Sequence, residues 1–251
     1  EANRDKYAAF AEGYKVYFDP STRFMRGLDS EGNWRTPFNP RASNHRNDDY
    51  CEGTAWQWTW FVPHDVDGLV ELMGGRDAFI GKLDSLFTAD SKLEGESTSV
   101  DISGLIGQYA HGNEPSHHIA HLYNYVGQPW RTQEIVDEVL HTLYFNNPDG
   151  LSGNEDCGQM SAWYILNAMG FYQVCPGKPV YSIGRPLFNE ATVHLKDGKS
   201  FKVIAHNNSR DNKYVQSIVL NGNKLETPFF THQDIVDGGT LELTMGSEPL
   251  K

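Results

Sequence analysis

Carboxylates, amides and histidines that could perform chemistry gather at three places in this 251-residue chain. The segment 105–125, LIGQYAHGNEPSHHIAHLYNY, carries four histidines, two asparagines and one glutamate but no lysine or arginine. Glu52 precedes a run of three tryptophans, and Glu155 and Asp156 lie in the loop NNPDGLSGNEDCG. Burying polar groups without partners is costly, so segments of this kind are candidates for a functional site.

The histidine-rich segment allows three interpretations. In the first, hydrogen bonds satisfy the histidines inside a buried helix, because histidine is intermediate in burial. In the second, His117 and His121 bind zinc from one helical face, although the order of residues is not H-E-x-x-H. In the third, Asn113 and Glu114 at the start of that helix offer the oxygen atoms that calcium prefers. The segment alone does not choose among them.

The acidic residues at the other two places suggest acid–base chemistry. A carboxyl group among indole rings is desolvated, which raises its pKa, so Glu52 is a candidate general acid. The competing interpretation is that Glu52 caps the following helix, and Asp156 could equally be a simple cap. Two carboxyl groups in different surroundings, together with aromatic rings and oxygen ligands, favour a glycosidase site.

Helices and loops must hold these residues in place. Apolar periodicity predicts helices over residues 4–16, 63–73, 77–87, 132–143 and 161–169, joined by long loops. After residue 176 the period changes, and short alternating runs at 191–195, 200–205, 215–220 and 240–245 predict antiparallel strands. Successive helices whose loops meet at one end predict a helical toroid. Because strands follow these helices, the expected fold class is α+β.

The composition excludes several classes of protein. A formal net charge of −12 argues against a nucleic-acid or polyanionic partner. No apolar run is long enough to span a membrane. Three cysteines without a C-x-x-C motif argue against a disulfide scaffold. The chain opens without methionine, so we expect a processed product or an excised part of a longer protein.

Four joined motifs carry a resemblance to a known family. YCEGTAWQWTWFVPHDVDGLVELMGG, HGNEPSHHIAHLYNYVGQPWRTQ, DGLSGNEDCGQMSAWYILNAMGFYQVCPG and PFFTHQDIVDGGTLELTMGSEP resemble glycoside hydrolase family 92. That family consists of calcium-dependent, inverting exo-α-mannosidases, many of them specific for α-1,2-linked mannose, with a β-sandwich before an (α/α)6 barrel. The resemblance implies that this chain corresponds to the C-terminal portion. Residues 1–178 would be a partial barrel and 179–251 a small antiparallel β-rich region, without the sandwich and the early barrel helices.

The resemblance also implies roles for the acidic residues. Glu52 in CEGTAWQ resembles the general acid, and Asp156 in GNEDCG resembles the general base, with Glu155 as the alternative base. In inverting enzymes such carboxyl groups stand roughly 6.5–9.5 Å apart, which leaves room for a water molecule. Asn113 and Glu114 resemble ligands of a Ca²⁺ ion that binds the 2- and 3-hydroxyls of the terminal mannose.

Five further residues are candidate substrate-binding groups: Trp56, Gln108, His111, His117 and Asn154. The calcium interpretation otherwise makes the histidines packing groups around the site. The expected partner is a mannose-containing oligosaccharide or glycoprotein glycan, as in N-glycan degradation. The expected location is secreted, periplasmic or on the surface of a bacterium. A non-catalytic mannose-binding module and a zinc-dependent hydrolase are the alternatives, and the sequence determines neither linkage preference nor oligomeric state.

Overall fold

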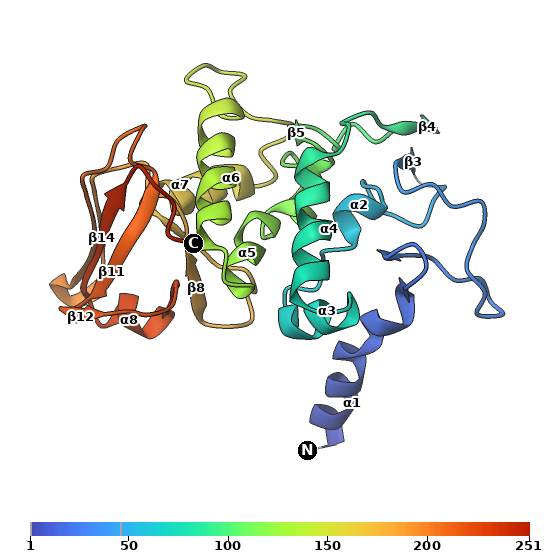
Figure 1. Cartoon of the computed structure of the whole chain (residues 1–251), viewed down its shortest axis with the longest axis horizontal. Helices are drawn as coiled ribbons and strands as arrows, with labels where there is room; N and C mark the ends of the chain where they lie inside the picture. The colour runs from blue at the N-terminus through green and yellow to red at the C-terminus, as the bar shows by residue number, and fades with distance from the viewer. Residues whose placement is uncertain (1, 46) are drawn as a thin grey trace. The chain divides into compact units, whose positions relative to one another are not determined.

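The computed structural model describes residues 2–45 and 47–251, and the chain divides into two compact units. The first unit runs to Ser116, and the second covers His117–Lys251. In the first unit helices alternate with short strands, whereas in the second unit helices are followed by longer strands (Figure 1). No helix in the described part of the chain is long and apolar enough to cross a bilayer.

The first unit consists mainly of short elements joined by long loops. They are α1 (Ala2–Ala11), the 3-10 turn η1 (Gly13–Tyr17), β1 (Phe18–Asp19), β2 (Phe24–Met25), β3 (Ala42–Asn44), α2 (Ala55–Trp58), α3 (Val66–Leu72), α4 (Arg76–Thr88), β4 (Glu94–Ser97), β5 (Leu105–Ile106), β6 (Tyr109–Ala110) and the 3-10 turn η2 (Glu114–Ser116). β1 pairs with β2 and β5 with β6 in antiparallel fashion, while β3 and β4 pair in parallel.

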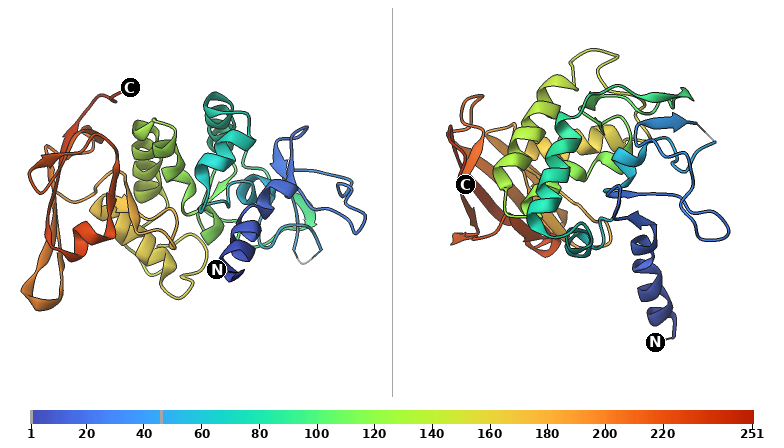
Figure 2. Two further views of the ribbon diagram at one scale, coloured as in Figure 1. Left: turned by 90° about the horizontal axis from the view of Figure 1, so that it is seen from below. Right: turned by 45° about the vertical axis from the view of Figure 1, so that its right-hand side comes forward.

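Helix α4 provides much of the buried surface of the first unit. Phe79, Leu83 and Leu86 are fully buried at helical spacing, as the apolar periodicity predicted. Helix α1 behaves differently, because it projects away from the rest of this unit (Figures 1 and 2). The side chains of Tyr7 and Phe10 in α1 are 63% and 65% exposed, so its apolar stripe is not part of the core.

The second unit places three α-helices before the strands in the described chain. Its elements are η3 (Ile119–His121), α5 (Leu122–Tyr125), α6 (Pro129–Thr142), α7 (Gln159–Met169), β7 (Phe171–Tyr172), β8 (Val180–Ile183), β9 (Glu190–His194), η4 (Lys196–Gly198), β10 (Ser200–His206), β11 (Tyr214–Leu220), β12 (Asn223–Lys224), β13 (Phe229–Thr231), α8 (His232–Val236) and β14 (Gly239–Gly246). The four strands predicted from alternation are β9, β10, β11 and β14.

The main sheet of the second unit has the order β12-β11-β14-β10-β9. Three of its pairings are antiparallel, but β10 and β14 run parallel, with Phe201 beside Gly239. This corrects the expectation of a purely antiparallel region. A parallel pair requires a crossover, and here the chain passes through β11, β12, β13 and α8 between the two strands.

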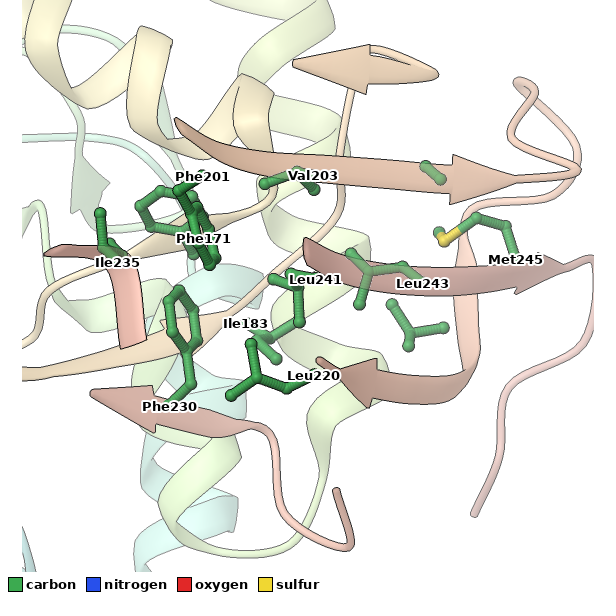
Figure 3. Packing of buried hydrophobic residues seen from close by; sticks show 12 residues of the cluster. Phe171, Ile183, Phe201, Val203, Leu220, Phe230, Ile235, Leu241, Leu243 and Met245 are labelled. Carbon is green, nitrogen blue, oxygen red and sulfur yellow. The ribbon is translucent and has the colours of Figure 1, made fainter. Parts of the chain in front are cut away.

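Aromatic residues form the centre of the core beside this sheet. Phe171, Phe201 and Phe230 are buried and lie against one another, with Leu241 and Leu243 of β14 beside them (Figure 3). The Phe201 and Phe230 rings stack at 5.8 Å between centroids. Such ring pairs contribute stability beyond the apolar area that they bury.

The histidine-rich segment departs most from its prediction. Instead of one helix after Pro115, it forms η2, η3 and the short helix α5. Asn113 and Glu114 therefore stand at a single 3-10 turn, and His117 and His121 do not share the face of a continuous helix. The Asn113 side chain accepts the Glu114 N–H at 3.2 Å, a local hydrogen bond of the kind that competes with helical pairing.

Candidate active site

Glu52 occupies an uncommon backbone conformation just before α2. Its φ angle is 51°, in the left-handed region that residues other than glycine, asparagine and aspartate rarely adopt. The next helix is well capped, because the Thr54 hydroxyl accepts the Trp56 N–H at 3.2 Å and the Gln57 side-chain oxygen accepts the Thr54 N–H at 2.6 Å. The capped helix that follows Glu52 thus holds its backbone in a conformation that costs free energy.

The carboxyl group of Glu52 is open to solvent rather than buried among tryptophans, which corrects the expected desolvation. Trp58 donates its indole N–H to the Cys51 carbonyl at 2.8 Å. It lies so close to Gly53 that a Cβ atom there would be 2.7 Å from the indole nitrogen. Trp58 therefore fixes the peptide beside Glu52. The Glu52 carboxylate has no hydrogen-bond partner within the described residues.

Asn113 joins the Glu52 peptide to the histidine-rich segment. Its Nδ2 donates to the Glu52 carbonyl at 2.8 Å, which orients Oδ1 toward the Glu114 N–H at 3.2 Å. Glu114 is half-buried, and the buried Ser116 hydroxyl finds no hydrogen-bond partner among residues 2–45 and 47–251. Amide, carboxylate and hydroxyl oxygens are donors that calcium accepts. These oxygens are of the chemical kind that a calcium site uses, and calcium takes six to eight of them.

His121 is a buried structural residue. Its Nε2 donates to Asn167 Oδ1 at 2.8 Å, and its Nδ1 lies 3.0 Å from the Ser182 hydroxyl. Burial lowers the pKa of His121 to about 4, so the ring is neutral. Binding a zinc ion would break one of these bonds. Across the described residues no group of three His, Cys, Asp or Glu side chains is arranged to hold a metal ion. Both observations disfavour the zinc interpretation.

The other two histidine candidates are also buried. His117 is 2% exposed, its Nδ1 lies 3.1 Å from Gln159 Nε2, and its carbonyl accepts the Trp163 indole N–H at 2.9 Å. His111 is fully buried, with Nδ1 2.8 Å from the Tyr109 hydroxyl. In this structure both histidines pack within the protein, and neither presents its ring to solvent.

The remaining substrate-binding candidates differ in exposure. Gln108 is fully buried and has a structural role. Its Nε2 donates to the Asp90 backbone carbonyl at 2.6 Å, and its backbone carbonyl accepts from Gln57 Nε2 at 2.6 Å. Trp56 is half-buried, and Asn154 is exposed. Trp56 and Asn154 are therefore the candidates in this group that offer surface to a ligand.

Glu155 and Asp156 are not equivalent, although they are adjacent. Both oxygens of Glu155 bind Ser161 in the first turn of α7, accepting its N–H at 3.1 Å and its hydroxyl at 3.0 Å. Asp156 is exposed, and its carboxylate has no hydrogen-bond partner in the described chain. Asp156, Cys157 and Gly158 have φ angles of 51°, 57° and 95°, a left-handed run. Glu155 thus holds the helix, and Asp156 is available for chemistry.

Comparison with known proteins places the chain in a family. Residues 1–247 match the model of the glycosyl hydrolase family 92 catalytic domain. The chain belongs to family 92. A curated relative, an uncharacterized secreted glycosidase from Arthroderma benhamiae, is 32% identical over 200 residues, which cover 78% of this chain and 24% of that protein.

Solved family 92 structures resemble the chain closely. An α-mannosidase from Bacteroides thetaiotaomicron in complex with mannoimidazole superposes with a TM-score of 0.88 at 43% identity, covering 94% of this chain and 32% of that one. An inverting mannosidase from the same organism gives a TM-score of 0.84 at 41% identity, covering 98% of this chain and 34% of that one. The chain thus spans about a third of the length of these relatives.

One unusual residue of this family 92 chain, Lys82, was not predicted from the sequence. Lys82 in α4 is 8% exposed, with Nζ 3.1 Å from the centroid of the Phe24 ring and 4.5 Å from that of Trp56. Burial lowers the pKa of Lys82 to about 7. Helical spacing offered a signal, because Lys82 is three residues after Phe79 and four before Leu86 and so lies on the buried stripe.

Proposed function

We propose that this chain is part of an inverting, calcium-dependent exo-α-mannosidase that removes α-1,2-linked terminal mannose from oligosaccharides or glycoprotein glycans. The observation that carries the proposal is the 43% and 41% identity to solved family 92 mannosidases, one of which is described as inverting. Residues 1–178 would contribute helices to an (α/α)6 toroid, and 179–251 would form the β-rich region. Because the curated relative is described as secreted, we also propose export, to the periplasm or surface of a bacterium.

The proposed reaction uses two carboxyl groups. Glu52 protonates the glycosidic oxygen as the bond to the anomeric carbon breaks, and Asp156 takes a proton from the water that attacks that carbon from the other side. The configuration is inverted because a single displacement occurs. Glu52 has a φ angle of 51°, which is uncommon for glutamate, and strained conformations of this kind cluster at functional sites. Since Glu155 binds Ser161 through both oxygens, Asp156 is the better candidate for the base.

Asn113 and Glu114 are the residues that would hold calcium. When bound, the ion would supply a fixed positive charge that binds the 2- and 3-hydroxyls of the terminal mannose. Asn113 has a second task that needs no metal, because its Nδ2 bond to the Glu52 carbonyl fixes the peptide that carries the acid. Replacing Asn113 should therefore weaken calcium binding and also disturb the position of Glu52.

Mannose release from α-1,2-mannobiose tests the proposal. The assay compares this chain with a longer protein in which the family's N-terminal part precedes it, each with calcium and with EDTA. We expect calcium-dependent release by the longer protein, with β-mannose as the first product by NMR. A first product with α configuration, or release that is indifferent to EDTA, would contradict the inverting or calcium-dependent part of the proposal.

Variants separate the roles of the carboxylates. Asp156→Asn should slow release by roughly 10²–10⁴-fold, whereas Glu155→Gln should mainly lower stability. Glu52→Gln should be inactive on mannobiose yet recover activity on a dinitrophenyl mannoside, because that leaving group needs no proton. If mannose binds to the Glu52→Gln and Asp156→Asn proteins and the unmodified protein never turns over, the mannose-binding module replaces the enzyme.

A further inference from the structure

A cleft in the first unit plays no part in the proposed reaction. It encloses about 290 Å³ beside η1 and the loop before α2. Half of its lining residues are aromatic, namely Tyr14, Tyr17, Tyr50, Trp58 and Phe61, and the charged residues Arg26 and Asp49 also line it. Pockets that bind small molecules combine apolar walls with a few polar groups in this way, and this one is near the lower end of their size range.

Three of the rings are held in place by their polar ends. The Tyr14 hydroxyl donates to Asp65 at 2.8 Å, the Tyr50 hydroxyl donates to the Met25 carbonyl at 2.7 Å, and the Trp58 indole donates to a backbone carbonyl at 2.8 Å. Because these bonds satisfy the polar ends of the rings, the rings are held in place without a ligand. The cleft is therefore formed before a ligand arrives.

The other rings form an exposed rim. Tyr17 is 51% exposed and Phe61 46% exposed, and Phe61 meets Trp58 edge to face at 5.3 Å. Asp49 lies against Gly27, where a Cβ atom would be 2.4 Å from the carboxyl carbon. Glycine at that position makes room for the carboxylate, which pairs with Arg35. A charged hydrogen-bond acceptor thus accompanies the aromatic faces.

This combination suits a sugar ring better than an apolar side chain. A pyranose has a face of C–H groups that can lie on aromatic rings and an edge of hydroxyls that can donate to a carboxylate. Asp49 is paired with Arg35, but a carboxylate can accept several hydrogen bonds, so sugar hydroxyls could donate to it in addition, whereas an apolar side chain would use the rings alone. The volume of the cleft admits one sugar ring rather than an extended chain.

We propose that this aromatic cleft binds a hexopyranose of the glycan other than the mannose that is released. The inference rests on the proposed function, which supplies a glycan as the substrate. The cleft borders the peptide of the proposed acid, because Asp49 and Tyr50 precede Glu52 in the same loop and Trp58 binds the carbonyl of Cys51. Occupancy of the cleft would strengthen glycan binding and would not change the chemistry at the released sugar.

Binding to this chain can be followed through the indole N–H signal of Trp58 in ¹⁵N-labelled protein, assigned with Trp58→Phe. The titration uses α-1,2-mannobiose and methyl α-mannoside in EDTA, so that the proposed calcium site does not contribute, with glycerol as the control solute. We expect a saturable shift of the Trp58 signal with both mannosides and none with glycerol. The absence of a saturable shift, or an equal shift with glycerol, would overturn the inference.

Two rim variants and one matched control locate the binding. Tyr17→Ala and Phe61→Ala should each weaken binding by roughly 2- to 10-fold, as expected for loss of one aromatic contact. Phe10→Ala removes a ring of similar exposure in α1, outside the cleft, and should leave affinity unchanged. Unchanged affinity in both rim variants would refute the cleft as the site. If the longer protein hydrolyses mannobiose but no sugar binds in the cleft, only this inference fails. If mannobiose binds in the cleft but neither protein hydrolyses it, the proposed function fails instead.

Discussion

Replacing Lys82 with methionine should change how the stability of this protein depends on pH. The Lys82 ammonium group is buried against the rings of Phe24 and Trp56, and no hydrogen bond or ion pair to it occurs in the described chain. Its pKa is lowered from 10.5 to about 7, mainly by burial. Methionine has a similar length and no charge, so it fills the same space without the cost of desolvation.

The sign of the effect follows from proton linkage. Between pH 7 and pH 10.5 the unfolded chain keeps the Lys82 proton and the folded chain loses it, so wild-type stability rises with pH in that window. Each unit of pH within the window is worth about 1.4 kcal/mol. From pH 7 to pH 9 the wild type should gain about 2 kcal/mol from this residue, because the folded group is still half protonated at pH 7. Lys82→Met lacks this gain.

Urea unfolding at pH 7, 8 and 9 measures the difference between the two proteins. We expect the stability of Lys82→Met relative to wild type to be highest at pH 7 and to fall by about 2 kcal/mol at pH 9. Lys92→Met, which removes an exposed lysine, is the control, and its difference from wild type should stay constant. A constant difference for Lys82→Met as well would show that the Lys82 amine keeps its proton in the folded state, which would refute the lowered pKa.

Three other changes test residues of the site. Glu155→Gln should lower stability by about 1 kcal/mol and leave mannose release within a few-fold of wild type, since this carboxylate caps α7; equal losses of activity for Glu155→Gln and Asp156→Asn would argue against Asp156 as the base. Glu52→Gly should raise the unfolding free energy by about 1 kcal/mol while abolishing release, because glycine adopts φ 51° without strain; a thermal melt that shows destabilisation would contradict this. His121→Leu should be less stable at pH 7, but the gap should shrink by about 2 kcal/mol at pH 5, because the lowered pKa of His121 costs the wild type stability as pH falls through 6.5 toward 4; urea titrations showing a gap independent of pH would refute the neutral buried ring.

Much of the fold was predictable because burial imposes regular spacing. The helices α4, α6 and α7 and the strands β9, β10, β11 and β14 appear near their predicted positions, since each has one apolar face to bury. Partners that lie far apart in sequence were not predictable. The parallel pairing of β10 with β14, and of β3 with β4, depends on long crossovers that leave no periodic signal. The apolar periodicity of α1 also does not predict that this helix is exposed.

Sequence motifs nominated the members of the site, and the structure adds local detail that the motifs do not contain. Motifs selected Glu52, Asn113, Glu114 and Asp156, whose roles remain predictions. Sequence alone left Asp156 and the adjacent acid as rivals for the base, and only the hydrogen bonds to Ser161 distinguish them. The left-handed backbone of a glutamate has no signature in composition, because the restraint comes from the helix cap that follows it rather than from the residue.

The position of β14 sets the order in which the main sheet can assemble. β9 and β10 form one antiparallel pair and β11 and β12 another, each from nearby segments, so both pairs can form early and locally. The two pairs do not touch until β14 enters between β10 and β11. Before that step each pair exposes an unsatisfied edge, which is the feature that recruits strands from other molecules. We therefore expect insertion of β14 to be the step at which productive folding of the second unit competes with aggregation.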